Sequence, residues 1–174
     1  MPAAFRSTVE EHADRVRSAL APIVDRSSER VALHDAAGRV TAGEVRSPLD
    51  LPLFTNSQMD GYAVHATDVA PATRSAPIAL PVAQALPAGP VAAEPLRPGT
   101  AARVMTGAPI PPGADAVIPV EDTDGGTTTV AISRPRRAGE YLRERGSDAR
   151  AGDLLVPAGT ALAPHRLAAL AAAG

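Results

Sequence analysis

The sequence predicts an α+β fold that is rich in β-structure and has an amphipathic helix at each end. Apolar residues recur at helical spacing near both termini, whereas the residues between form short apolar segments broken by proline and glycine. Aromatic residues make up only 2% of the chain, so any core must be built from Val, Leu, Ile and Ala. Such a core favours thin β modules over a single thick one.

Composition excludes several kinds of site and partner. The 174 residues carry a formal net charge of −2, which gives no reason to expect a nucleic-acid partner. The absence of cysteine excludes disulfides, thiolate nucleophiles and zinc–thiolate sites. The longest uncharged run, residues 75–93, contains prolines that forbid a membrane-spanning helix. We therefore expect a soluble, cytoplasmic protein with no membrane partner.

Two helices are expected, one near each terminus. Residues 7–20, which Pro22 follows, form the first, with Ser7 or Thr8 as N-cap and acidic residues at capping-box spacing. The second covers residues 164–173 and begins with proline, which suits a first helical turn. The apolar stripe of the first helix consists of Val9, Ala13, Val16 and Leu20.

Strands are expected through the middle of the chain. Between residues 29 and 45 the apolar period changes to two, which predicts one or two short strands. Residues 64–102 are cut by prolines, so we expect edge strands and loops there and no helix. A strand, a Thr-Gly-Ala turn and a Pro-Pro-Gly bend then lead to a second strand over residues 116–120.

Turn residues predict two hairpins in the last third of the chain. Asp-Gly-Gly at residues 124–126 separates the apolar residues 117–120 from a β-branched run at 127–132. A Pro-Ala-Gly turn separates residues 154–156 from residues 160–162 in the same way. Each pair of segments is expected to form an antiparallel hairpin.

The most polar loop lies within residues 48–64. Asn56 and Ser57 precede Asp60-Gly61, a dipeptide that is typical of tight turns because glycine tolerates a positive φ. A turn alone does not require the polar residues in front of it, and loops of this kind also form binding sites. A capped hairpin turn and a binding loop therefore both remain open.

Two later motifs have the same ambiguity. Thr106 and Gly107 could offer a hydroxyl and open backbone amides to an anion, or could form an ordinary turn. Arginines including Arg143 alternate about Gly146, and Asp148 follows. This group could hold an oxyanion together with a divalent cation, or could be a solvated charged loop.

In their order and spacing the three motifs resemble those of the molybdenum insertases. This family, the molybdopterin molybdenumtransferases, includes the C-terminal domain of gephyrin. The resemblance rests on residues 52–63, on the Thr-Gly-Ala and Pro-x-Gly-Ala-Asp-Ala-Val segments with a following Glu121, and on the arginine-rich run that ends at Asp148. Two positions depart from the family pattern: Thr55 stands where an acidic residue is usual, and Ser147 replaces one member of an acidic pair.

The resemblance covers nearly all of the chain and implies an elongated region of two modules. A small β module would combine residues 23–46 with residues 147–163. Residues 47–146 would form an inserted, mostly β module. An N-terminal helix would occupy residues 1–22, and a C-terminal helix over residues 164–174 would lead to a pterin-binding domain that is absent from this chain.

The activity implied by the resemblance is transfer of molybdenum from molybdate to adenylylated molybdopterin, with release of AMP. Family members act as homodimers and use Mg²⁺. The implied catalytic residues are Asp60, Thr106 and Asp148, and the two aspartates would also hold the metal. The implied substrate-binding residues are Asn56, Ser57, Gly61, Gly107 and Arg143.

Two interpretations of function remain open. In the first, the chain is part of an insertase, holds half of an active site and is inactive alone. In the second, it is a non-enzymatic, β-rich interaction or assembly module that docks a partner through its terminal helices. A β domain that carries a covalent cofactor is disfavoured, because the chain has no lysine to attach biotin or lipoate.

Overall fold

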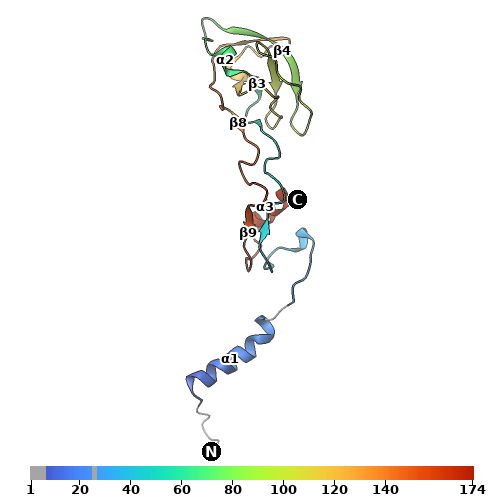
Figure 1. Ribbon diagram of the computed structural model, residues 1–174, viewed down its shortest axis with the longest axis vertical. Coiled ribbons are helices and arrows are strands. Elements are labelled where there is room, and N and C mark those ends of the chain that lie inside the picture. Colours follow the sequence, from blue (N-terminus) through green and yellow to red (C-terminus); the bar gives the residue numbers. More distant parts are fainter. Residues whose placement is uncertain (1–6, 25–26) are drawn as a thin grey trace, which may run out of the picture.

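A five-stranded sheet with strand order β6-β3-β5-β4-β7 forms the larger of two β regions (Figure 1). The computed structural model describes residues 7–24 and 27–174. β4 and β5 run parallel, and the other neighbouring strands are antiparallel. The β-rich α+β fold is thus confirmed. The five strands are β3 (Gly61–Val64), β4 (Ile78–Leu86), β5 (Ala101–Val104), β6 (Ala116–Pro119) and β7 (Thr129–Ile132).

Apolar side chains are buried on both faces of this sheet. One group of buried residues includes Tyr62, Val64 and Ile118, and the other includes Ala63 and Val117. Because side chains alternate along a strand, residues adjacent in sequence fall into different groups. Tyr62 is the one aromatic residue in either buried group, so the core is built mainly from Val, Leu, Ile and Ala, as expected from the composition.

The smaller β region joins two distant parts of the chain. β1 (Val45–Arg46) pairs antiparallel with β9 (Leu154–Val156), and Val40 forms a β-bridge with Ala161. Helix α3 (Pro164–Ala173) packs here through half-buried leucines. These contacts agree with a discontinuous module, although its exact boundaries remain a prediction. The buried centre consists of Ala36, Val156 and Leu162.

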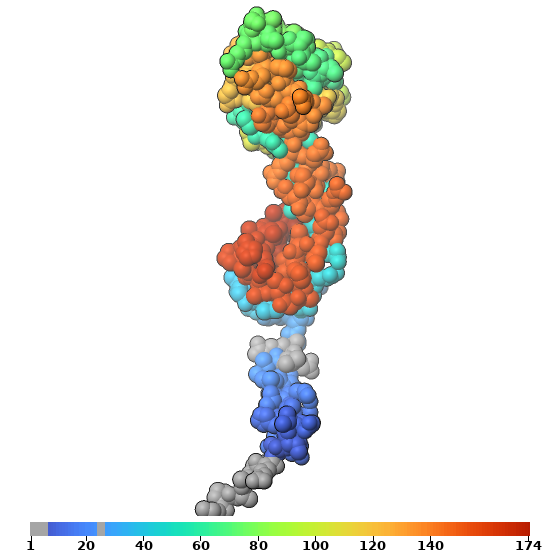
Figure 2. Space-filling view, turned by 90° about the vertical axis from the view of Figure 1, so that its left-hand side faces the viewer, coloured from blue at the N-terminus to red at the C-terminus, as the bar shows by residue number. Residues whose placement is uncertain are grey.

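Two chain segments run side by side between the two β regions, where Figure 2 shows a narrower waist. One segment leads into β2 (Asn56–Ser57) and the other follows β8 (Leu142–Arg143). β2 pairs antiparallel with β8 and so links both segments to the large sheet. Further along, the Leu51 amide donates to the Ala149 oxygen at 2.7 Å, and the Asp148 amide donates to the Leu51 oxygen at 2.8 Å. This ladder holds the loop before β3 against residues 143–149.

Helix α1 (Val9–Val24) differs from expectation at its end. The predicted capping box is confirmed: the Thr8 amide donates to Glu11 Oε2, and the Glu11 amide donates to Thr8 Oγ1. The helix continues beyond residue 20 and contains Pro22. Pro22 lies in the last turn of the helix, where few residues follow the hydrogen bond that its missing amide removes. The apolar residues Val9, Val16 and Leu20 are exposed rather than covered.

The strands expected between residues 29 and 45 are largely wrong. Leu33–Asp35 is a 3₁₀-helix, η1, and only Val45–Arg46 belongs to a strand. A strand needs a neighbour for its backbone groups, and in this segment only residues 38–41 and β1 have partners in a distant part of the chain. The alternation of apolar residues therefore did not decide the local structure.

The segment 64–102 contains more regular secondary structure than expected, and the expectation of no helix there is wrong. It contains the single-turn helix α2 (Ala66–Val69), whose Ala66 amide is capped by Asp115 Oδ1 at 2.7 Å. β4 is an interior strand of nine residues despite Pro81. It pairs with β7 up to Pro81 and with β5 from Val82 onward, and the register shifts at this exchange. Proline is tolerated where pairing is irregular.

Both predicted hairpins are wrong in their pairing. β6 and β7 lie at opposite ends of the strand order, and only the Thr123–Ile132 bridge closes the turn between them. β9 pairs with β1 rather than with the residues that follow its own turn. Turn residues indicate where the chain reverses, but not which segment a strand joins. Among the described residues, no helix has the length and apolar character needed to cross a membrane.

Candidate functional site

Asp60 and Thr106 form the best-defined polar contact at the predicted site. Asp60 Oδ1 accepts hydrogen bonds from the Thr106 amide at 2.6 Å and from the Thr106 hydroxyl at 2.7 Å. Asp60 directly precedes β3 and Thr106 closely follows β5, so the antiparallel pairing of these strands brings the two together. The amide and hydroxyl of Thr106 lower the pKa of Asp60, which keeps this carboxylate ionised at neutral pH.

The glycines of the two motifs have structural roles. A Cβ on Gly61 would overlap the backbone carbonyl of Ile118, so only glycine fits against β6. Gly107 has φ +81°, and its amide donates to the Ser57 oxygen at 2.8 Å. The Thr106 amide is likewise occupied by Asp60. The expectation that this turn offers open amides to an anion is therefore wrong for these two groups.

Asn56 and Ser57 are buried and shape the loop before β3. Asn56 Nδ2 donates to the Phe54 oxygen at 3.1 Å, and Ser57 Oγ donates to the Met59 oxygen at 2.6 Å. Ser57 is only 1% exposed. Both side chains thus fix the backbone that leads to Asp60, a role that stabilises the site without direct access to a ligand.

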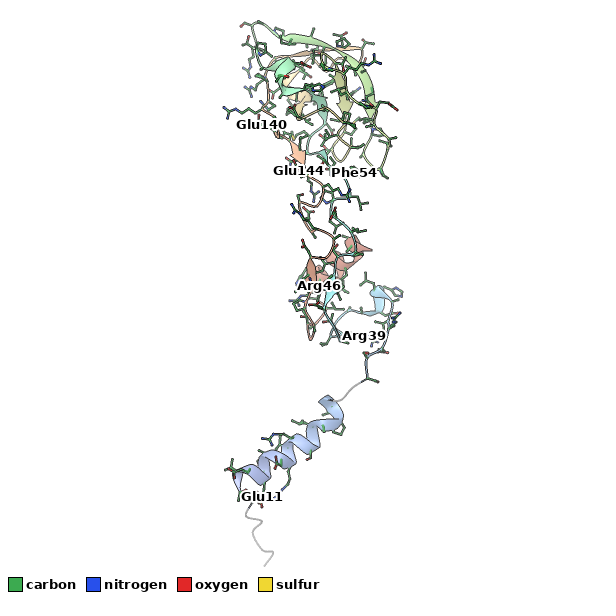
Figure 3. The ribbon with its side chains drawn as sticks, in the orientation of Figure 1. Glu11, Arg39, Arg46, Phe54, Glu140 and Glu144 are labelled. Carbon is green, nitrogen blue, oxygen red and sulfur yellow. The ribbon has the colours of Figure 1, made fainter. Side chains whose placement is uncertain are left out.

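Arg143 joins the site through β8. It is the cross-strand partner of Asn56, so the β2–β8 pair carries it to the polar loop. Its guanidinium forms an ion pair with Asp148, and both side chains are about half exposed. In Figure 3, Phe54 and Glu144 mark the place where the two segments leave the large sheet. The structure therefore gathers the site residues in two polar pairs, Asp60–Thr106 and Arg143–Asp148.

The two aspartates of the predicted metal site have separate partners. Asp60 binds Thr106 and Asp148 binds Arg143. Within residues 7–24 and 27–174, no group of three or more acidic or histidine side chains is placed to hold a metal. Mg²⁺ commonly uses one or two carboxylates together with substrate phosphates. Either aspartate alone could serve that mode of binding, in which the substrate supplies the remaining ligands.

Sequence reasoning missed the contact between Asp50 and Arg145, which braces this region. Asp50 Oδ1 accepts from the Ala151 amide at 2.9 Å, and Oδ2 accepts from Arg145 Nε at 2.7 Å. These two donors lower the pKa of Asp50. Thr55 Oγ1 accepts from the Arg145 amide at 3.2 Å, so the residue that departs from the family pattern also holds this loop. Asp50 and Arg145 lie 95 positions apart, which left no local signal to detect.

Two surface hollows flank the large sheet. A hollow of about 680 Å³ is lined by α2 and residues 135–140, and it contains none of the predicted site residues. A smaller one, of about 200 Å³, lies beside the Thr106 turn. Its lining is Ala85, Leu86, Pro87, Arg103 and Met105. Only the smaller hollow adjoins the candidate site.

Residues 7–174 match the family model described as the MoeA N-terminal region (domain I and II). The chain belongs to this family. It is 47% identical over 144 residues to molybdopterin molybdenumtransferase 2 of Mycobacterium tuberculosis, which covers 83% of this chain and 36% of that protein. It is 42% identical over 149 residues to the molybdopterin molybdenumtransferase of Synechococcus elongatus, covering 84% and 36% respectively.

Solved structures of the MoeA family agree with the fold. The molybdopterin biosynthesis MoeA protein from Pyrococcus horikoshii superimposes with a TM-score of 0.79 at 38% identity, over 84% of this chain and 38% of that one. The chain thus spans between about a third and two fifths of the length of the MoeA relatives it matches. The family resemblance noted from the motifs is confirmed for this N-terminal part.

Proposed function

We propose that this chain is the N-terminal part of a molybdopterin molybdenumtransferase, which inserts molybdenum from molybdate into adenylylated molybdopterin and releases AMP. The observation that carries the proposal is the Asp60 carboxylate, which two hydrogen bonds from Thr106 hold in one orientation. The names of the relatives support the same reaction class. This part of the enzyme would act in the cytoplasm, in the synthesis of the molybdenum cofactor.

The site residues divide the chemistry between charge neutralisation and orientation. Asp60 Oδ1 is occupied by Thr106, which leaves Oδ2 to face a cation, and Asp148 would supply the second carboxylate. Bound Mg²⁺ would neutralise charge on the phosphoanhydride as it is broken. Arg143 would bind oxygens of molybdate or phosphate, since a guanidinium fork matches such anions. Thr106 would act by keeping Asp60 ionised and correctly aimed.

We expect the chain to be inactive alone. The pterin-binding domain of the implied enzyme would follow residue 174, and the complete site would form between the subunits of a homodimer. Asn56 and Ser57 are buried beneath the loop, and Gly61 and Gly107 are tied to neighbouring backbone, so these four residues would shape the half-site. The exposed groups of the two polar pairs would contact the substrate.

The test is AMP release from adenylylated molybdopterin in the presence of molybdate and Mg²⁺. The chain is assayed alone and then mixed with the separately prepared downstream segment of a MoeA family member. We expect turnover only in the mixture. Turnover by the chain alone would place the pterin site within these residues, which contradicts the proposal. Silence in a mixture that demonstrably associates would also contradict it.

A docking module remains the second candidate, because one observation favours it. The apolar stripe of α1 is uncovered: Val9 is 82% exposed and Val16 is 44% exposed. On this interpretation Val16→Asp abolishes binding of the partner protein, whereas Asp60→Asn leaves that binding intact. Leu170 is a poor probe for this purpose, because it packs against the small β region and its substitution would unfold that region.

A further inference from the structure

Arg103 stands out among the arginines of the described chain. Three arginine side chains there are half-buried. Arg136 pairs with Asp122, and Arg166 donates to the Ala161 oxygen at 2.7 Å. Arg103 pairs through its backbone in β5, but its side chain makes no hydrogen bond or ion pair with any described residue. A guanidinium that has lost part of its hydration without gaining a partner costs stability, so such a group calls for a ligand.

The strand register places Arg103 on the same side of the sheet as Asp60. Arg103 in β5 is the Cα partner of Tyr62 in β3. Asp60 lies two residues before Tyr62, and the ladder still holds there because the Val120 amide donates to the Asp60 oxygen at 3.0 Å. Residues two apart on a strand share a face, and diagonal neighbours are about 7–8 Å apart. A side chain as long as arginine can span that distance.

The hollow beside the Thr106 turn adds space for a ligand. Arg103 is the only charged residue among the five that line its volume of about 200 Å³. The other four are apolar, and no carboxylate lines the hollow. The hollow therefore leaves room for a small ligand beside the Arg103 side chain.

We propose that Arg103 binds a tetrahedral oxyanion of the substrates beside the Asp60–Thr106 pair. This inference rests on the proposed function and deepens it by naming a second cation of the half-site. Arg143 is already engaged by Asp148, whereas the guanidinium of Arg103 is uncommitted. The oxyanion has two possible sources in the reaction, molybdate itself and the phosphate that leaves in AMP.

The test is anion binding to the 174-residue chain, followed by NMR of the arginine Nε–Hε groups. Sodium molybdate and AMP are titrated separately, so the anion that binds identifies the source. Arg103→Gln removes the charge, and Arg97→Gln is the matched control, because Arg97 is exposed and its side chain has no described partner. We expect wild type and Arg97→Gln to bind equally, and Arg103→Gln to bind at least about tenfold more weakly.

Two results would overturn the inference: equal binding by Arg103→Gln, or no binding of either anion to the wild-type chain. If Arg103→Gln fails to fold, the wild-type spectrum decides, because the Arg103 signal must shift on titration while the Arg97 signal stays still. In the AMP-release mixture, unchanged kinetics of a folded Arg103→Gln would refute the inference and leave the proposed function standing. A mixture that stays silent although Arg103 binds anion would refute the proposed function alone.

Discussion

Thr106 donates both its backbone amide and its hydroxyl to the same oxygen of Asp60. The two bonds come from one residue, so they fix the direction of the carboxylate, and its other oxygen has no partner among the described residues. They also join the end of β5 to the start of β3. The arrangement explains how an exposed loop can present an ionised group in one orientation, which is the property that the proposed half-site requires.

Removing only the hydroxyl tests this relationship. Thr106→Val keeps the side-chain shape and the amide bond to Asp60 but deletes the second donor. Loss of a hydrogen bond to a metal-binding or catalytic carboxylate typically costs between about ten- and a hundredfold in activity. We expect a decrease of that size in AMP release by the mixture, with circular dichroism unchanged. Thr106→Ser restores the hydroxyl, and it would have to restore activity.

Gly61→Ala tests the close approach of β3 to β6. The new Cβ would overlap the Ile118 carbonyl, and backbone cannot give way as a flexible side chain can. We expect a loss of about 3 kcal/mol or more in the free energy of unfolding, measured by denaturant titration. Gly43→Ala is the matched control, because a Cβ there meets nothing within 4 Å. Equal stability of the two variants would refute the packing argument.

The Asp122–Arg136 pair is predicted to matter for stability. Both side chains are nearly buried, at 13% and 14% exposure. Asp122→Asn leaves a guanidinium without its counter-charge, and breaking such a pair costs about 3 kcal/mol. Asp14→Asn breaks the exposed pair with Arg17 and should change stability by less than about 1 kcal/mol. Denaturant titration of both variants distinguishes the two cases.

Acid sensitivity should report on Asp50. The Ala151 amide and Arg145 lower the pKa of Asp50 below the ordinary value of 3.8. A carboxylate whose pKa is lower in the folded state than in the unfolded state stabilises the fold above its unfolded-state pKa. This contribution is lost as the pH falls through its folded-state pKa. The stability gap between wild type and Asp50→Asn should therefore shrink below a pH of about 4. If the difference in stability between wild type and Asp50→Asn did not change as the pH falls, the lowered pKa assigned to Asp50 would be contradicted.

A control keeps the acid test specific. Glu94→Gln also removes one carboxylate, but the side chain of Glu94 accepts no hydrogen bond from the described residues. Thermal unfolding of the wild type and both variants from pH 6 to pH 3 makes the comparison. Only Asp50→Asn should show a difference from wild type that depends on pH.

Local signals in the sequence predicted local structure well. The Thr8–Glu11 capping box, the helix over residues 164–173 and the strand that begins at Ala116 are present as expected. Each depends on neighbours within a few positions along the chain. The long strand β4 escaped detection because Pro81 argues against an interior strand, and only the exchange of pairing partners makes it tolerable.

Long-range pairing could not be predicted in the same way. The turn at residues 124–126 is real, yet β7 joins β4 rather than β6. Local sequence signals could not predict the contacts at the site either. Asp60 and Thr106 are 46 positions apart, and the family motifs rather than their spacing suggested that they meet. Arg145 lies in the arginine-rich motif and Asp50 in the stretch 48–64, but no pattern paired the two, so their contact emerged only from the structure.

The most direct test of the half-site compares two aspartates in the AMP-release mixture. Asp60 and Asp124 both accept two hydrogen bonds that lower their pKa values, but Asp124 lies in the turn before β7. We predict that Asp60→Asn reduces AMP release by at least about a hundredfold, while Asp124→Asn retains it and both variants stay folded. Equal activity of the two folded variants would contradict the claim that Asp60 belongs to an insertase site.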